Sequence, residues 1–108
     1  MKRIDHKYLK IQTKKVLIKY GANDFSAESV SKGLIETSLR GVDSHGIRLL
    51  PHYLNALKNG RVNGNPKFNI IRTFPAFVGL KADNAFGHAA GYKSIEIGIE
   101  LANEYGIG

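Results

Sequence analysis

The residue types best suited to chemistry lie in one short stretch, Gly41-Val42-Asp43-Ser44-His45-Gly46-Ile47-Arg48. It brings together a carboxylate, a hydroxyl, an imidazole and a guanidinium. An imidazole exchanges a proton near neutral pH, and a guanidinium can hold a carboxylate with two parallel hydrogen bonds. These groups suit a 2-oxo acid, with Arg48 on the carboxylate and His45 serving the neighbouring carbonyl or hydroxyl oxygen.

Two neighbours of His45 can influence it in different ways. Either Asp43 or Ser44 can fix one tautomer of the imidazole, and either side chain can instead accept a hydrogen bond from a free amide in the first turn of a following helix. A lone histidine beside a serine is more often a capping or packing residue than a catalytic one. Residue types alone therefore favour the noncatalytic interpretation.

Helices on both sides must position this stretch. Apolar residues at helical spacing predict an amphipathic helix over residues 5–20 that ends at Gly21. A second helix, capped by Ser26, is expected to run to Arg40 and to stop at Gly41. Two helices joined by so short a loop predict a helical hairpin. The expected buried residues are Leu9, Thr13, Val16, Leu17 and Tyr20 in the first helix and Val30, Leu34, Ile35 and Leu39 in the second.

Pro51 decides how the next helix begins, because proline inside a helix removes a backbone donor and crowds the preceding turn. Either the helix proper starts near Leu50, with Pro51 at its first position, or a longer helix is kinked. We favour the first alternative, which leaves His45 and Arg48 on an irregular loop that leads into the helix. This helix is expected to end at Asn59-Gly60.

The remaining chain predicts strands followed by a helix. Residues 68–74 and 77–81 are rich in β-branched and aromatic residues and indicate two strands broken at Pro75-Ala76. Helical spacing resumes near residue 85 and continues to about Tyr105. Glycines within this helix predict close packing against another element. A strand after Ile107 would extend the sheet, so the pattern by itself predicts a truncated protein of α+β class: N-terminal helices, two short strands and a C-terminal helix.

Composition excludes several classes of protein. The chain has 108 residues, 43% of them hydrophobic, and no apolar run long enough to cross a membrane. It has no cysteine, which excludes disulfides and thiolate metal sites and fits a cytoplasmic protein. Histidines and carboxylates show no spacing typical of metal ligands, so no metal site is predicted.

The net charge of +7 leaves a second class of function open. The chain can be read as a noncatalytic basic helical module that binds an anionic partner. A solvated helix face is the more common origin of such lysines. Nucleic acid is unlikely as the partner, because the segment lacks interleaved aromatic residues. The cationic residues are Lys2, Arg3, Lys7, Lys10, Lys14, Lys15 and Lys19.

The exact order of the residues adds a resemblance to a known family. Leu39-Arg40-Gly41-Val42-Asp43-Ser44-His45-Gly46, followed by Leu49-Leu50-Pro51-His52-Tyr53-Leu54, resembles the N-terminal signature of the malate/L-lactate dehydrogenase family. That family includes NAD(P)-dependent malate, sulfolactate and ureidoglycolate dehydrogenases and a diketogulonate reductase. The later Asp83-Asn84 helix ending in Tyr105-Gly106-Ile107-Gly108 is similar too. The absence of Gly-x-Gly-x-x-Gly agrees with a family that binds its nicotinamide cofactor in its own way.

The resemblance implies roles for individual residues. His45 would be the proton donor and acceptor, Ser44 would lie in the same site, and Arg48 would bind the substrate carboxylate. Many members have the arginine four positions after the histidine, where this sequence has Leu49. Tyr53 would line the site or, as an equal alternative, pack as an aromatic on the helix face. No role is implied for His6, His52 or His88.

Family members are much longer than this chain. The resemblance therefore implies the N-terminal portion of a larger α/β oxidoreductase fold, with helices over 1–60 and the start of a strand-helix region over 61–108. The cofactor, NAD or NADP, would be bound by residues beyond this portion, and the substrate would be a small 2-oxo or 2-hydroxy acid. We expect a fragment or split gene product that is inactive alone, and a homodimer for the full-length protein.

Overall fold

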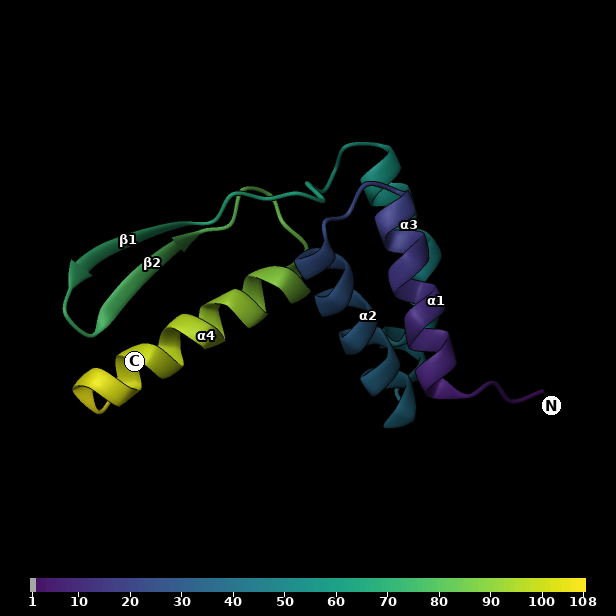
Figure 1. Ribbon diagram of the computed structural model, residues 1–108, viewed down its shortest axis with the longest axis horizontal. Helices are drawn as coiled ribbons and strands as arrows, with labels where there is room; N and C mark the ends of the chain where they lie inside the picture. Colours follow the sequence, from purple (N-terminus) through teal and green to yellow (C-terminus); the bar gives the residue numbers. More distant parts are fainter. Residues whose placement is uncertain (1) are drawn as a thin grey trace.

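A computed structural model describes residues 2–108 and confirms the α+β class (Figure 1). Three helices form a helical body, and a two-stranded hairpin with the last helix forms an arm that extends from it. No helix in residues 2–108 combines the length and apolarity needed to span a membrane. The elements are α1 (His6–Lys19), α2 (Asp24–Leu39), the 3₁₀ turns η1 (Asp43–His45) and η2 (Ile47–Leu49), α3 (Leu50–Lys58), β1 (Asn69–Phe74), β2 (Phe77–Lys81) and α4 (Gly87–Tyr105).

The helical hairpin is formed by α1 and α2, as predicted, but the residue that caps the start of α2 differs from the prediction. Asn23, not Ser26, caps α2, and its side-chain oxygen accepts a hydrogen bond of 2.8 Å from the backbone N–H of Ser26. Because α2 already begins at Asp24, Ser26 lies inside the first turn and is completely buried. The predicted capping role of Ser26 is therefore wrong.

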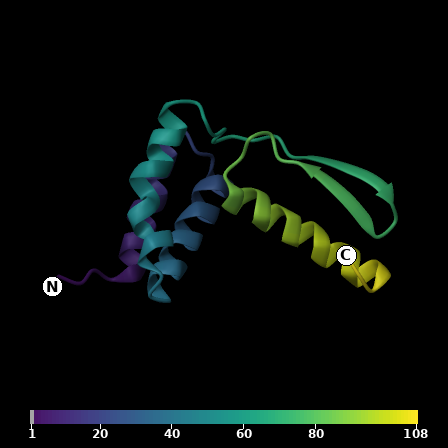
Figure 2. The same cartoon turned by 180° about the vertical axis from the view of Figure 1, so that it is seen from behind.

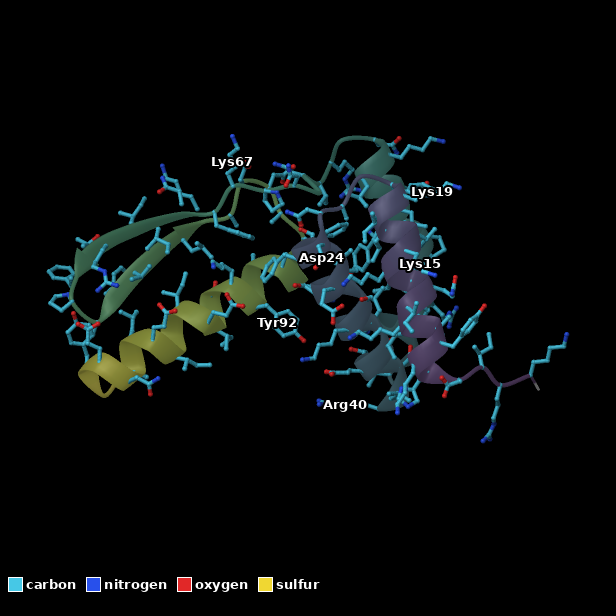
Figure 3. The ribbon with its side chains drawn as sticks, in the orientation of Figure 1. Lys15, Lys19, Asp24, Arg40, Lys67 and Tyr92 are labelled. Carbon is cyan, nitrogen blue, oxygen red and sulfur yellow. The ribbon has the colours of Figure 1, made fainter. Side chains whose placement is uncertain are left out.

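Two lysines of α1 form ion pairs with carboxylates of α2 across the helical hairpin. Lys10 Nζ lies 2.6 Å from Glu28, and Lys14 Nζ lies 3.0 Å from Asp24 and 3.3 Å from Glu28. The hydrogen bond from Lys10 lowers the pKa of Glu28, and the bond to Asp24 raises the pKa of Lys14. Part of the basic charge of α1 is thus paired within the chain, whereas Lys15 and Lys19 on the same helix are exposed (Figure 3).

The hydrophobic core is centred on α2. Predicted core residues Leu17, Val30 and Leu34 are fully buried, but Leu39 is 59% exposed. Leu39 borders an open groove between α1 and α2, so no element covers its side chain. Tyr20, at the end of α1, is exposed as well. The core residues are Leu17, Ala22, Ala27, Val30, Leu34, Phe86 and Ala89.

The arm consists of an antiparallel hairpin that runs alongside α4 (Figure 2). Asn69 pairs with Lys81, and the register shifts between Arg72 and Phe74, next to the turn. The expected close packing at the glycines of α4 is wrong: a Cβ added at Gly87, Gly91 or Gly98 would meet no atom within 4 Å. The positions of these glycines on α4 are therefore not packed against another element of residues 2–108.

Hydrogen bonds between loops connect the arm to the helical body. Asp83 and Asn84 both have positive φ angles, of 52° and 57°. The Asp83 carboxylate accepts bonds of 2.9 Å from the Asn63 side chain and from the Lys67 backbone N–H. The Asn23 backbone N–H donates to the carbonyl oxygen of Gly64 at 2.7 Å. Polar side chains with local hydrogen bonds tolerate the left-handed conformation better than apolar ones.

One buried hydroxyl provides a test of this core. Ser26 Oγ has no hydrogen-bond partner in residues 2–108. An unsatisfied buried polar group costs about 1–3 kcal/mol. Ser26→Ala should therefore raise the free energy of unfolding by about 1 kcal/mol in urea denaturation. Ser31→Ala is the matched control, because buried Ser31 Oγ donates to the Glu28 carbonyl at 3.1 Å and its loss should bring no gain. A less stable Ser26→Ala variant would contradict this account.

Candidate active site

The end of α2 fixes where the Ser44–His45 pair begins. Gly41 has a φ of +79°, a conformation that glycine adopts without steric cost. Its N–H donates to the Ser38 carbonyl at 3.0 Å, and the Val42 N–H donates to the Thr37 carbonyl at 3.2 Å. These two bonds form the Schellman motif that closes a helix. The chain reverses at Gly41 and lies against the last turns of α2.

Two consecutive 3₁₀ turns then lead to α3. The His45 N–H donates to the Val42 carbonyl at 3.1 Å, and the Leu49 N–H donates to the Gly46 carbonyl at 3.0 Å. α3 begins at Leu50, which confirms the favoured alternative of an irregular lead-in.

Neither candidate cap, Asp43 or Ser44, caps a helix. No side-chain hydrogen bond caps η1, η2 or α3. Because α3 starts only at Leu50, these two side chains lie too far upstream to reach its free amides. That part of the prediction is wrong.

Ser44 and His45 contact each other directly. Ser44 Oγ lies 2.8 Å from Nδ1 of His45, and both residues are exposed. Asp43 makes no hydrogen bond to the imidazole within residues 2–108. The serine hydroxyl can donate to a bare Nδ1 or accept from a protonated one. In either case the contact restrains the ring and leaves Nε2 without a partner among the described residues.

The other two predicted site residues have different environments. Arg48 lies on η2, is exposed, and forms no ion pair with a carboxylate of residues 2–108. Tyr53 is half-buried on α3, with its ring edge-on to those of Phe86 and His88 at centroid distances of 5.6 Å. Arg48 is thus available for an anion, while the Tyr53 ring packs between α3 and α4.

No role was predicted for His88, yet this residue joins three elements. Its imidazole on α4 contacts Tyr53 of α3 and lies against Gly33 of α2, where an added Cβ would be 3.0 Å from Nε2. Burial lowers the pKa of His88. A glycine inside an otherwise regular helix was the available signal, because such a glycine often marks a close approach. Figure 3 shows Tyr92, also on α4, on the side that faces α2.

Neither a metal-ligand cluster nor a Gly-rich dinucleotide loop is found in the described residues. No group of three or more His, Cys, Asp or Glu side chains in residues 2–108 could hold a metal ion. The sequence contains no Gly-x-Gly-x-x-Gly loop of the kind that binds a dinucleotide pyrophosphate. No residue of this chain is assigned to a nicotinamide cofactor.

Comparison with known proteins finds a matching family and similar sequences. The sequence profile of the family described as malate/L-lactate dehydrogenase matches residues 4–108. The malate dehydrogenase of Pyrococcus abyssi is 38% identical over 94 residues, which cover 87% of this chain and 26% of that protein. The L-sulfolactate dehydrogenase of Methanocaldococcus jannaschii is 33% identical over 93 residues, covering 86% of this chain and 27% of that protein.

A solved structure matches over nearly the whole chain. The malate dehydrogenase of Pyrococcus horikoshii OT3 superimposes with a TM-score of 0.93 at 34% identity, covering 99% of this chain and 31% of that one. The chain therefore spans between a quarter and a third of the length of the relatives it matches.

Burial of His88 predicts a loss of stability in mild acid. Its folded-state pKa lies below the ordinary value of about 6.5, so the unfolded chain binds the proton first. The free energy of unfolding should fall as pH drops below about 6.5, until the folded form is protonated too. Urea denaturation at about pH 7 and about pH 5 should show this loss, and His88→Gln should reduce it. His6→Gln, a change at an exposed histidine, should leave it intact. Equal losses in all three proteins would exclude His88 as the cause.

Proposed function

The chain belongs to the malate/L-lactate dehydrogenase family, and from this premise we propose that it forms the N-terminal part of an NAD(P)-dependent oxidoreductase. The proposed reaction interconverts small 2-hydroxy acids and 2-oxo acids. One observation supports it most directly: Ser44 Oγ lies 2.8 Å from Nδ1 of His45 on an exposed turn. This contact restrains one nitrogen of the imidazole and leaves the other for chemistry.

The proposed role of His45 follows from its two ring nitrogens. When Nδ1 is protonated it donates to Ser44 Oγ, and neutral Nε2 then carries a free lone pair. In that state Nε2 accepts the proton of a substrate hydroxyl, and the resulting imidazolium returns it to a carbonyl oxygen in reverse. Ser44 can thus accommodate the useful tautomer, and because its hydroxyl can remain the acceptor in both protonation states, it need not move during the reaction.

Arg48 is proposed to bind the carboxylate of the substrate. Its guanidinium is exposed and unpaired within residues 2–108, which leaves both parallel N–H groups available. It follows His45 by three residues in the chain, so the two side chains are suited to adjacent groups of one small acid. Tyr53 is proposed to border the site through its place on α3, with its ring anchored against α4.

The remaining part of the reaction belongs to the cofactor. Oxidation of a 2-hydroxy acid removes a hydride from carbon and a proton from oxygen. NAD or NADP is the hydride acceptor that the family implies. The residues of this chain would transfer the proton and bind the carboxylate. Cytoplasmic location and a homodimer of the full-length protein remain part of the proposal.

Anion binding by the basic N-terminal helix is the competing function. It is weakened because Lys10 and Lys14 are engaged by carboxylates of α2. The cations near the N-terminus that remain exposed are Lys2, Arg3, Lys7, Lys15 and Lys19.

A chimera tests the role of His45. Residues 4–108 would replace the matching segment of the Pyrococcus horikoshii malate dehydrogenase, and NADH oxidation would be followed with several 2-oxo acids. Loss of the acid–base group in His45→Gln should lower kcat by roughly 10²- to 10⁴-fold. His6→Gln should leave kcat unchanged. Normal turnover by the His45→Gln chimera would overturn the assignment, and robust turnover by the 108-residue chain alone would show that it needs no further segment.

The same chimera tests Arg48 separately. Arg48→Lys keeps the positive charge but loses the two parallel hydrogen bonds. We expect KM for the 2-oxo acid to rise by roughly tenfold or more, because a charge-assisted hydrogen bond contributes about 1.5–3 kcal/mol. An unchanged KM would remove Arg48 from the substrate site and leave the proposal for His45 in place.

A further inference from the structure

We propose that Ser38, acting through its contact with Gly46 and Ile47, positions the Ser44–His45 pair against the end of α2. The inference rests on the function proposed above, because it assigns a positioning residue to the same site. Ser38 touches neither the imidazole nor any group proposed to contact the substrate. It acts by fixing the backbone from which His45 projects.

A direct hydrogen bond joins Ser38 to the segment just after His45. The backbone N–H of Ile47 donates to Ser38 Oγ at 2.8 Å, although the two residues are nine positions apart. Ser38 is half-buried, so this bond is partly shielded from water. Without the hydroxyl, no other acceptor in residues 2–108 bonds to this N–H.

Gly46 brings the turn into contact with the same serine. Gly46 is buried, and a Cβ added to it would overlap Ser38 Oγ and lie 3.1 Å from both Cα and Cβ of Ser38. The close approach of the two backbones requires glycine at this position. The backbone conformation does not, because a φ of −97° is open to any residue. The hydrogen bond and the absent side chain therefore act at one point of contact.

The result is a short segment held at both ends. Upstream, the Val42 N–H bonds to the Thr37 carbonyl at 3.2 Å, and downstream the Ile47 N–H bonds to Ser38 at 2.8 Å. Ser44 and His45 lie between these two bonds. Fixing the backbone on both sides fixes the direction of both side chains, which their own exposure would otherwise leave free.

Ser38 differs from two other serines of the same helix. Ser29 Oγ donates to the Phe25 carbonyl and Ser31 Oγ donates to the Glu28 carbonyl, which is the usual local bond of a helical serine. Ser38 instead accepts a bond from outside the helix. Ser31→Ala is therefore a matched control for the loss of a serine hydroxyl from α2.

NMR of the 108-residue chain tests the proposal without any need for turnover. In Ser38→Ala, hydrogen exchange at the Ile47 amide should become roughly tenfold faster, because the bond is lost. The Nδ1 resonance of His45 should move toward that of a free imidazole, because the turn no longer holds Ser44 against it. Ser38→Thr, which keeps the hydroxyl, should restore both readouts, and Ser31→Ala should change neither.

Three results would overturn the proposal. The first is a folded Ser38→Ala variant with an unchanged His45 resonance. The second is an equal change in Ser31→Ala, which would indicate general destabilisation. The third applies only if Ser38→Ala does not fold. Gly46→Ala then replaces it as the test, because this change displaces the turn and leaves α2 intact. An unchanged His45 resonance in Gly46→Ala would reject the proposal.

The two proposals fail separately. An inactive chimera, or one indifferent to His45→Gln, would reject the dehydrogenase function while the NMR readouts of the 108-residue chain stand. Unchanged NMR readouts in an active chimera would reject the role of Ser38 and leave the reaction intact.

Discussion

Packing on several sides of α2 determines how the other elements can be arranged. α1, α4 and the turn after Gly41 all pack against this one helix. A helix with so many neighbours needs small side chains, and α2 provides them where its partners come closest. Gly33 admits the imidazole of His88, and Ser38 admits the backbone of Gly46. Larger residues at these two positions would push the neighbouring element away from the helix.

The same constraint explains how an exposed site can be well defined. His45 is not enclosed, so packing around its own side chain cannot orient it. Its direction depends on the backbone, which is closed onto α2 by the Schellman motif at Gly41 and by the bond to Ser38. Rigid support beneath an accessible group suits the proton-transferring role proposed for His45, because a substrate must reach the group while its geometry stays fixed.

Patterns that depend on neighbours in sequence predicted much of this fold. Helical spacing, Gly41 and Pro51 placed the helices, and residue types placed the hairpin. The cap of α2 was missed because both Asn23 and Ser26 are good capping residues and only the helix start distinguishes them. Pairs such as Gly33 with His88 could not be predicted, because a single sequence does not show which residues of α4 meet which residues of α2. The candidate site stretch could be singled out by its residue types, but its attachment to Ser38 could not be predicted.

The candidate site is built from local contacts. The contacts that define it join residues that are close in sequence: Ser44 with His45, Val42 with Thr37, and Ile47 with Ser38. Closing such short loops costs little chain entropy, and contacts of low sequence separation form early in folding. The β hairpin and α4 are joined to the body by longer-range contacts, such as those of Asp83 and Asn84 with the loop after α3. The turn that carries Ser44 and His45 can therefore assemble as a local unit on α2, before the β hairpin and α4 have packed.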